Sequence, residues 1–204
     1  MNNKEQIIKK FSLSLDQSNK FDKYIYEINQ YNKFINVVGK STLINPWQSH
    51  ILDCIQICKH IPNKKSSILD MGAGAGLPGL VLAIYNYSNV SLIDSNLKKI
   101  NFVKLVCSKL NISSKIYHNR IEKLINMKFD YLVSRALSNL NKLFFYSHRL
   151  LKNGGALIFL KGFQVNDEIN EAQKNWAFNH KLFTSISDER GKIIVVKNLK
   201  KIHD

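Results

Sequence analysis

An apolar run, an acid and a ladder of glycines follow one another in Ser66-Ser-Ile-Leu-Asp-Met-Gly-Ala-Gly-Ala-Gly-Leu-Pro-Gly79. This order is typical of a strand that turns sharply around a ligand, because glycine lets the backbone take positive φ and approach the ligand with no Cβ in the way. A helix that follows the turn points its free N–H groups at the same ligand. We therefore expect a nucleotide-binding loop in which Asp70, Gly72, Gly74 and Gly76 are the working positions.

Two classes of cofactor compete for this loop. The pattern Gly74-x-Gly76-x-x-Gly79 also fits the dinucleotide fingerprint, and Asp94, about 20 residues further on, suits a ribose in either class. Asp70, however, stands shortly before the first glycine, and a chain of 204 residues leaves little room for a separate substrate domain. The repeat Asp-x-Gly-x-Gly-x-Gly resembles the first motif of class I S-adenosylmethionine (AdoMet) methyltransferases, and a nicotinamide enzyme is the weakest alternative.

The composition is that of a globular protein with an excess of positive charge. Hydrophobic residues make up 45% of the chain, and 30 Lys and Arg against 15 Asp and Glu give a net charge of +15. Such a charge attracts polyanions and favours nucleic acid as a partner, although a biased genome composition also enriches Lys. No stretch approaches the ~20 apolar residues of a membrane helix, and the first residues lack the apolar segment of a signal peptide. We expect a cytoplasmic protein with no membrane partner.

The three cysteines make an odd count, which does not fit a secreted disulfide framework. Cys54 and Cys58 are close in sequence and have His50 and His60 nearby, so a metal site has to be considered. Because the chain has no Cys-x-x-Cys pair and no second ligand pair, we expect these cysteines to belong to the core and no metal to bind.

Hydrophobic periodicity divides the chain into two parts. Residues 1–62 predict an N-terminal helical cap with a break near residues 12–18 and a further helix that opens at Pro46 and ends before Pro62. Residues 63–204 predict one compact AdoMet-binding core, a Rossmann-like α/β fold with a seven-stranded, mostly parallel sheet and a C-terminal antiparallel hairpin. The expected strands are residues 68–71, 90–94, 115–118, 131–134, 156–161, 182–186 and 193–196, and the crossover helices include residues 98–110 and 140–151, the second ended by Asn153-Gly154-Gly155.

Charged side chains lie near the carboxyl ends of four of the expected strands. Because ligands bind beyond the carboxyl ends of parallel strands, Asp70, Asp94, Glu122 and Arg135 are candidates for one site. Asp94 suits the ribose hydroxyls, and Asp70 is placed to face the methionine amine of AdoMet directly or through water. Ile121 and Glu122 are placed to flank adenine. Each acid has the alternative role of a helix cap.

The segment after the expected fourth strand limits the reaction. Enzymes that methylate exocyclic amines commonly carry an Asn or Asp followed by two prolines and an aromatic there, whereas this chain has Ser134-Arg135-Ala136-Leu137. No cysteine lies in a strand-end loop, where the nucleophile of base C5 methylation is needed. A ring nitrogen with a free lone pair remains as the acceptor, since in-line alignment then suffices without a general base or a covalent enzyme intermediate.

Several motifs together resemble one family. In chain order they are Tyr31-Asn-Lys-Phe-Ile-Asn36, His50-Ile-Leu-Asp53, Leu69-Asp-Met-Gly-Ala-Gly-Ala-Gly-Leu-Pro-Gly79, Asp94-Ser95 with Lys98-Lys99 and Phe102, Ser134-Arg135-Ala136, and Leu160-Lys-Gly162. Over residues 24–197 the chain resembles the RsmG (GidB) family. The resemblance implies methylation of guanine N7 in 16S, small-subunit ribosomal RNA. It also implies a partner that is this RNA or an assembling ribosomal particle, and we expect a monomer.

The resemblance implies roles for particular residues. The implied AdoMet contacts are Gly72, Leu77, Ile121, Glu122 and Arg135, and the residues near the methyl-transfer cleft are Asn32, Asn36, His50 and Lys161. The chain departs from the family's usual pattern at Tyr31, where Trp is common, and at Cys54, where Ser is common.

Several roles stay open at this point. His50 and Asp53 fit a proton relay as well as a structural or RNA-positioning pair. Lys161 fits a phosphate contact or a solvent-exposed strand end, and Arg135 fits the methionine carboxylate, a phosphate or Glu122. A small-molecule methyltransferase and a non-catalytic RNA-binding protein with the same fold are the alternative functions.

Overall fold

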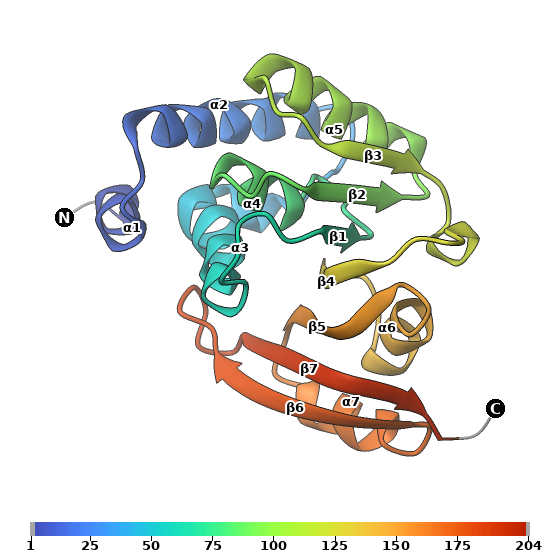
Figure 1. The fold of residues 1–204 in the computed structure, drawn as a ribbon. Coiled ribbons are helices and arrows are strands. Elements are labelled where there is room, and N and C mark those ends of the chain that lie inside the picture. Colours follow the sequence, from blue (N-terminus) through green and yellow to red (C-terminus); the bar gives the residue numbers. More distant parts are fainter. Residues whose placement is uncertain (1–2, 203–204) are drawn as a thin grey trace.

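The protein, described here over residues 3–202 by a computed structural model, is built on one sheet (Figure 1). Its strands are β1 (Ile68–Met71), β2 (Val90–Asp94), β3 (Lys115–His118), β4 (Phe129–Arg135), β5 (Leu151–Lys161), β6 (Trp176–Thr184) and β7 (Lys192–Lys201). They lie in the order β3-β2-β1-β4-β5-β7-β6. The first five strands pair in parallel, and β7 runs antiparallel to both of its neighbours. The predicted sheet and hairpin are confirmed.

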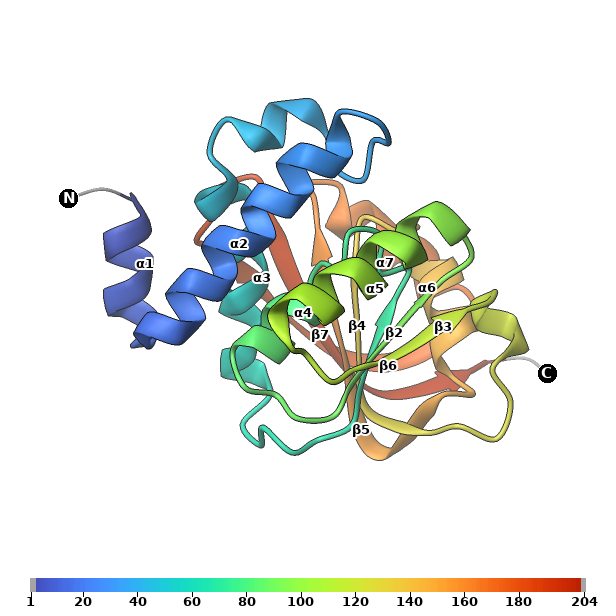
Figure 2. The ribbon, with the colours of Figure 1, turned by 90° about the horizontal axis from the view of Figure 1, so that it is seen from above.

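Helices cover both faces of this sheet (Figure 2). The core helices are α4 (Gly79–Ile84), α5 (Leu97–Leu110), α6 (Leu140–Ser147) and α7 (Val165–Ala172), with the short turn η4 (Ile121–Lys123). The N-terminal cap consists of α1 (Asn3–Phe11), α2 (Leu15–Asn32), η1 (Lys40–Leu43), η2 (Trp47–Leu52), α3 (Asp53–Ile55) and η3 (Gln56–His60). Within the described residues, no helix combines the length and the apolar character needed to cross a bilayer.

Alternate side chains of the central strands enter two hydrophobic clusters. Ile68 and Leu92 pack in the cluster that contains the cap, α4 and α5. Leu69 and Ile93, their neighbours along the strands, pack in the cluster that contains α6 and α7. This follows from the side-chain period of two in a strand. Because both faces are buried, the strands have near-continuous apolar sequences, which made them visible in the sequence.

The cap packs on the core through the apolar stripe of α2. Ser14 and Gln17 form a capping box that starts this helix. Phe21 and Tyr24 are fully buried and share a cluster with Ile68 of β1. The cap and the core therefore have one hydrophobic interior in common on this face of the sheet.

The helix predicted to open at Pro46 consists of three short pieces. Its first piece, η2, is a π-helix; α3 is α-helical, and η3 is a 3₁₀-helix that ends before Pro62. π-helical turns are rare and are often found at functional sites. Here η2 and α3 carry His50 and Asp53.

The structure differs from the prediction around β5. The predicted helix end at Asn153-Gly154-Gly155 is wrong, because α6 ends at Ser147 and both glycines lie inside β5. Gly154 has φ +77°, and the register between β4 and β5 shifts at this point. The glycine pair forms a bulge rather than a helix terminus.

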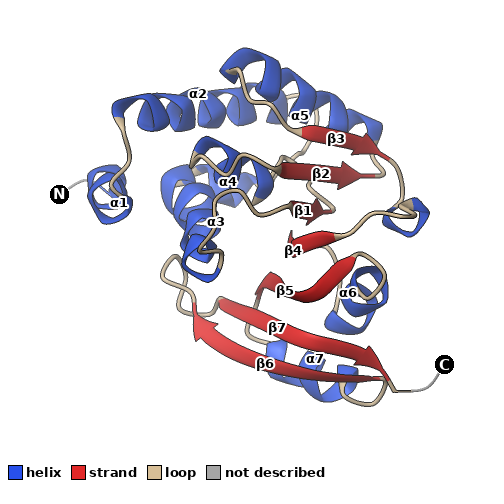
Figure 3. Ribbon diagram, in the orientation of Figure 1, coloured by secondary structure: helices blue, strands red, loops and turns tan. Residues whose placement is uncertain are grey.

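The hairpin edge of the sheet extends further than its apolar pattern indicates (Figure 3). β6 begins at Trp176, six residues before the predicted start at residue 182. Most of its side chains are polar or exposed, so no apolar run marks the edge strand. α7 has no counterpart in the prediction, since only Val165, Ile169 and Ala172 of this acid-rich helix are buried.

Candidate functional site

A cleft of about 680 Å³ opens at the carboxyl ends of β1, β2 and β4. One side, the glycine-loop wall, consists of residues 72–77 together with Asp94. The opposite side, the cap wall, consists of residues 37–42 together with His50. Residues 135–137, at the end of β4, line the cleft as well, and so do Ser95, Asn96 and Lys99 after β2.

Asp94 holds the glycine-loop wall in place. Its Oδ2 accepts a hydrogen bond from the backbone N–H of Gly74 at 2.9 Å, and its Oδ1 accepts one from the N–H of Asn96 at 2.8 Å. Gly72 has φ +68°, a conformation that favours glycine, and a Cβ on it would lie 2.5 Å from Cδ1 of Leu137 and would require this side chain to move. Each carboxylate oxygen of Asp94 keeps acceptor capacity for a further donor.

Asp70 lies buried beneath the glycine loop and does not line the cleft. Its Oδ2 accepts a hydrogen bond from the backbone N–H of Gly79, the first residue of α4, at 2.7 Å. Burial raises the pKa of Asp70 to about 7, and its Oδ1 has no hydrogen-bond partner among residues 3–202. A buried acceptor of this kind fits a bound amine or a water.

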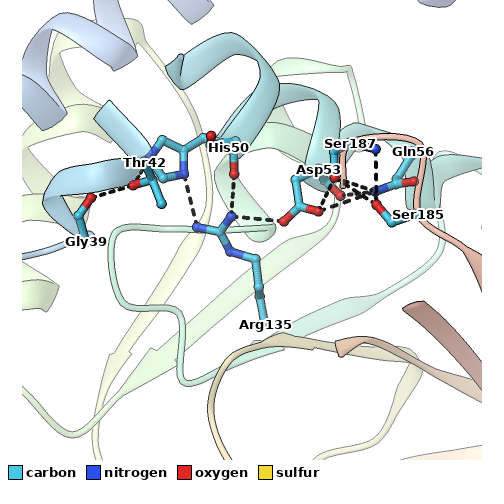
Figure 4. Close-up of polar contacts among 9 residues, drawn as sticks. Gly39, Thr42, His50, Asp53, Gln56, Arg135, Ser185 and Ser187 are labelled. Carbon is cyan, nitrogen blue, oxygen red and sulfur yellow. Dashed lines mark hydrogen bonds and ion pairs between the residues drawn. The ribbon is translucent and has the colours of Figure 1, made fainter. Parts of the chain in front are cut away.

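Arg135 joins the cap to the sheet (Figure 4). Its Nη1 donates to the backbone oxygen of Ser49 at 2.9 Å and to Oδ2 of Asp53 at 3.0 Å, and its Nη2 donates to Nδ1 of His50 at 3.3 Å. The side chains of Arg135 and Asp53 are 19% and 22% exposed. Arg135 therefore pairs with Asp53, a partner absent from the prediction, and not with Glu122.

The direction of these hydrogen bonds fixes the tautomer of His50. A guanidinium only donates, so Nδ1 of His50 accepts and Nε2 carries the proton. Nε2–H then donates to Oγ1 of Thr42 at 3.0 Å, and the Thr42 hydroxyl donates to the backbone oxygen of Gly39 at 2.6 Å. Burial and the positive charge of Arg135 lower the pKa of His50 to about 3. His50 is thus a neutral link between Arg135 and the cap wall.

Asp53 connects the same network to the loop between β6 and β7 (Figure 4). Its Oδ1 accepts a hydrogen bond from the Ser187 hydroxyl at 2.7 Å. The backbone N–H of Ile186 donates to Oε1 of Gln56 at 2.9 Å. Asp53 and His50 contact different nitrogens of Arg135, and no hydrogen bond joins their two side chains directly. The contacts therefore support a structural pair rather than a proton relay.

The structure brings together only some of the predicted site residues. Those that line the cleft are Gly72, Gly74, Leu77, Asp94, Arg135 and His50. Gly76 belongs to the same loop but packs against Leu80. Ile121 and Glu122 line a separate hollow of about 40 Å³ with Phe145.

Asn32, Asn36 and Lys161 do not line the cleft either. Asn32 shapes the cap wall from behind, because its Oδ1 accepts hydrogen bonds from the N–H groups of Val37 at 2.7 Å and Val38 at 3.1 Å. Asn36 is exposed.

Lys161 has a structural position. Its Nζ forms an ion pair with Glu168 at 2.6 Å and donates to the backbone oxygen of Ser138 at 2.8 Å. The side chain is only 10% exposed. It is therefore neither a solvent-exposed strand end nor a cation free to contact phosphate.

Three residues that the prediction did not assign to the site contribute to it. The Tyr24 hydroxyl donates to the backbone oxygen of Ala75 at 2.6 Å and so ties α2 to the glycine loop. A tyrosine in an apolar helical stripe was the available signal, because a buried hydroxyl needs a partner. Thr42 and Leu137 carry no comparable signal, since their roles depend on what lies across the cleft.

The three cysteines lie outside the cleft. Cys54 and Cys107 are buried, and Cys58 is half-buried. Burial raises the pKa of the Cys107 thiol to about 11 and that of Cys54 further. Among residues 3–202, no group of three His, Cys, Asp or Glu side chains is placed to hold a metal ion.

The chain matches one known family over most of its length. Residues 17–194 match the family described as rRNA small subunit methyltransferase G, GidB. This chain belongs to the GidB family. One GidB relative, the ribosomal RNA small subunit methyltransferase G of Rickettsia prowazekii (strain Madrid E), is 40% identical over 175 residues, which are 86% of this chain and 91% of the relative. The resemblance carried by the sequence motifs is confirmed.

Solved structures show that the GidB fold of this chain is shared more widely. A TehB-like SAM-dependent methyltransferase from Corynebacterium glutamicum superposes with a TM-score of 0.53 at 16% identity, covering 72% of this chain and 87% of that one. A variant of MtNAS in complex with S-adenosylmethionine gives a TM-score of 0.62 at 11% identity, covering 86% of this chain and 72% of that one. These likenesses concern the fold alone, and they confirm the predicted class I methyltransferase architecture.

Proposed function

We propose that this GidB protein transfers a methyl group from AdoMet to N7 of one guanine in small-subunit (16S) ribosomal RNA. The observation that carries the proposal is the cleft between the glycine loop, Asp94 and Arg135, in a chain of the small-subunit rRNA methyltransferase family. The net charge of +15 supports a polyanionic substrate.

The residues of the cleft fit AdoMet. Gly72 leaves no Cβ in the way of a ligand, and the free acceptor positions of Asp94 suit the ribose hydroxyls. Asp70 is buried beneath the glycine loop and does not line the cleft, and its unpartnered Oδ1 keeps the predicted role towards the methionine amine, directly or through water. AdoMet, when bound, supplies an electrophilic methyl group on a sulfonium.

Arg135 has donors left for this ligand. Its guanidinium carries five N–H groups, of which contacts with Ser49, Asp53 and His50 use three. The Nε–H and one Nη2–H of the guanidinium remain without a partner in these contacts. These two donors suit the methionine carboxylate. Ile121 and Glu122 keep the adenine role that the family resemblance implies, although they line a separate hollow that shares no residue with the cleft.

Among the described residues of the cleft, His50 and Asp94 already hold hydrogen-bond partners, which supports a ring nitrogen as the acceptor. His50 holds its Nε2 proton against Thr42 and has a pKa of about 3, and both oxygens of Asp94 hold backbone N–H groups. Guanine N7 carries a free lone pair and loses no proton when it takes the methyl group, so positioning suffices. The buried cysteines provide no covalent nucleophile.

Methyl mapping tests the proposal. The protein is incubated with AdoMet labelled in the methyl group and with small-subunit ribosomal RNA, and the labelled nucleotide is identified. We expect label on N7 of one guanine, and its loss in Asp94→Ala but not in Asp16→Ala, an exposed carboxylate on α2. Label on an exocyclic amine, on the protein or on no RNA would contradict the proposal.

We infer further that the protein acts in the cytoplasm as a monomer on ribosomal RNA or an assembling particle. Three free cysteines suit a reducing compartment. Comparing methylation of naked RNA with that of partly assembled subunits identifies the substrate, and sedimentation equilibrium identifies the oligomeric state.

A further inference from the structure

A second cavity, of about 240 Å³, lies beside the cleft and shares Arg135 and Ala136 with it. The rest of its lining includes Asp53, Lys161 and Lys192. It lies where β4 and β5 end and β7 begins, at the same edge of the sheet as the cleft. Ligands of open α/β sheets bind at this edge.

The wall between the two cavities contains an unusual backbone conformation. Ala136 has φ +54°, whereas the other described non-glycine residues with positive φ are Ser12 and four asparagines. Alanine rarely adopts this region, because its Cβ approaches the backbone. Such conformations persist where the surrounding structure enforces them, and they cluster at ligand sites.

The charges that line the second cavity are not balanced. Arg135 faces Asp53, and Lys161 faces Glu168. Lys192 has only a neutral partner, since its Nζ donates to Oγ1 of Thr184 at 3.2 Å and no carboxylate of residues 3–202 lies within ion-pair distance. A cavity with an uncompensated cation favours an anionic ligand.

The position of the cavity identifies this anion. A methyl acceptor has to lie next to the methyl donor, and the second cavity adjoins the cleft through Arg135 and Ala136. An RNA nucleotide has a base, which can lie against the wall of Arg135 and Ala136, and a phosphate, which can pair with Lys192. We propose that the second cavity receives the acceptor nucleotide of the RNA and that Lys192 neutralises one of its backbone phosphates. This inference rests on the proposed function.

A set of lysine variants tests it. Lys192→Gln removes the charge, and Lys192→Arg keeps it. Lys197→Gln is the matched control, because Lys197 lies on the same strand, is exposed and has no ion-pair partner within the described residues. Each variant is measured for RNA affinity at several salt concentrations, for AdoMet affinity by calorimetry, and for methyl transfer, after thermal unfolding has shown that it folds.

We expect Lys192→Gln to weaken RNA binding about fivefold to tenfold near 0.1 M salt, and to reduce the slope of log affinity against log salt by about 0.7 to 0.9, the contribution of one phosphate contact. Lys192→Arg and Lys197→Gln should match the wild type, and AdoMet affinity should be the same in all four proteins.

Three results would overturn the inference. In the first, Lys192→Gln binds RNA with wild-type affinity and salt dependence while the wild type methylates RNA; the proposed function then stands and only the cavity assignment fails. In the second, Lys192→Gln loses AdoMet affinity instead, which would assign the cavity to the cofactor. In the third, the wild type transfers no methyl group to RNA, and the proposed function fails with it.

Discussion

The two walls of the cleft are held by different kinds of contact. In the glycine-loop wall, Asp94 binds the N–H of Gly74, 20 residues away, and Asp70 binds the N–H of Gly79, nine residues away. In the cap wall, His50 is positioned by Arg135, which is 85 residues away in the chain. Arg135 in turn belongs to a network that reaches Ser187 through Asp53.

This difference has a structural consequence. The glycine-loop wall is a local motif in which backbone N–H groups bind carboxylates, and its contacts form within the consecutive elements β1, α4 and β2. The cap wall requires the cap, β4 and the hairpin loop to be packed together. The first wall therefore provides a preformed surface for a nucleoside, and the second links that surface to the hairpin and the second cavity. Four substitutions test the comparison.

The largest effect should come from Arg135→Met, which breaks the cap wall. It leaves the partly buried Asp53 carboxylate without its cation, and breaking such a pair costs about 4 kcal/mol of unfolding free energy. Denaturant unfolding measures the loss, with Arg149→Met, an exposed arginine on the other face, as the control. A loss below about 1 kcal/mol would mean that the network does not hold the cap.

The pH dependence of stability tests the glycine-loop wall. Because the pKa of Asp70 is about 7 in the folded protein and near 4 in the unfolded chain, the folded state retains a proton between these values that the unfolded chain releases. The contribution of Asp70 to stability should therefore fall by about 3 kcal/mol as the pH rises from 4 to 7, somewhat less than three full units of about 1.4 kcal/mol because both titrations are incomplete at the ends of this range. This decline should be absent in Asp70→Asn.

The control for this prediction is Asp16→Asn, at an exposed carboxylate, which should keep the pH dependence of the wild type. Protonation of His50 acts in the opposite direction, because its pKa is lowered in the folded state and stability falls as pH drops below about 6.5. The difference between wild type and Asp70→Asn removes this common contribution. A difference that does not change between pH 4 and 7 would show that Asp70 is charged in the folded protein.

Gly79→Ala should cost about 2 kcal/mol, because an added Cβ lies 2.8 Å from Oδ2 of Asp70 and 2.9 Å from Cδ2 of Leu92 in a packed interior. Thermal unfolding measures it. Gly162→Ala is the matched control, since a Cβ there has no atom within 4 Å. Equal stability of the two variants would show that the loop yields to the added atom.

The smallest effect should come from Tyr24→Phe, at the joint between the cap and the glycine loop. Losing the hydrogen bond to the backbone oxygen of Ala75 costs about 1 kcal/mol, because the carbonyl stays buried. AdoMet affinity should fall as well, while Tyr26→Phe, at a side chain that is 59% exposed, should change neither property. Wild-type AdoMet affinity in Tyr24→Phe would mean that the cap does not position the loop.

The sequence predicted some elements with their observed bounds and missed others. Strands β1, β2 and β3 were predicted with their observed bounds. Burial on both faces explains the near-continuous apolar runs of β1 and β2, whereas β3 is an edge strand whose terminal residues are exposed. The first six residues of the edge strand β6 and the whole of the amphipathic α7 were not predicted, since half-exposed elements leave weaker patterns. Within the site, Gly72, Gly74 and Asp94 line the cleft, and their contact with AdoMet stays a prediction, whereas Lys161 is ion-paired with Glu168.

The amino-acid sequence by itself determined the sheet, the glycine loop and the family. Each of them depends on residues that are neighbours in the sequence or on a repeated pattern. Tertiary packing, by contrast, decided which partner each charged side chain meets. Arg135 pairs with Asp53, and the proton of His50 is on Nε2, since the cap, β4 and the hairpin loop meet at that point of the folded chain and bury those groups together.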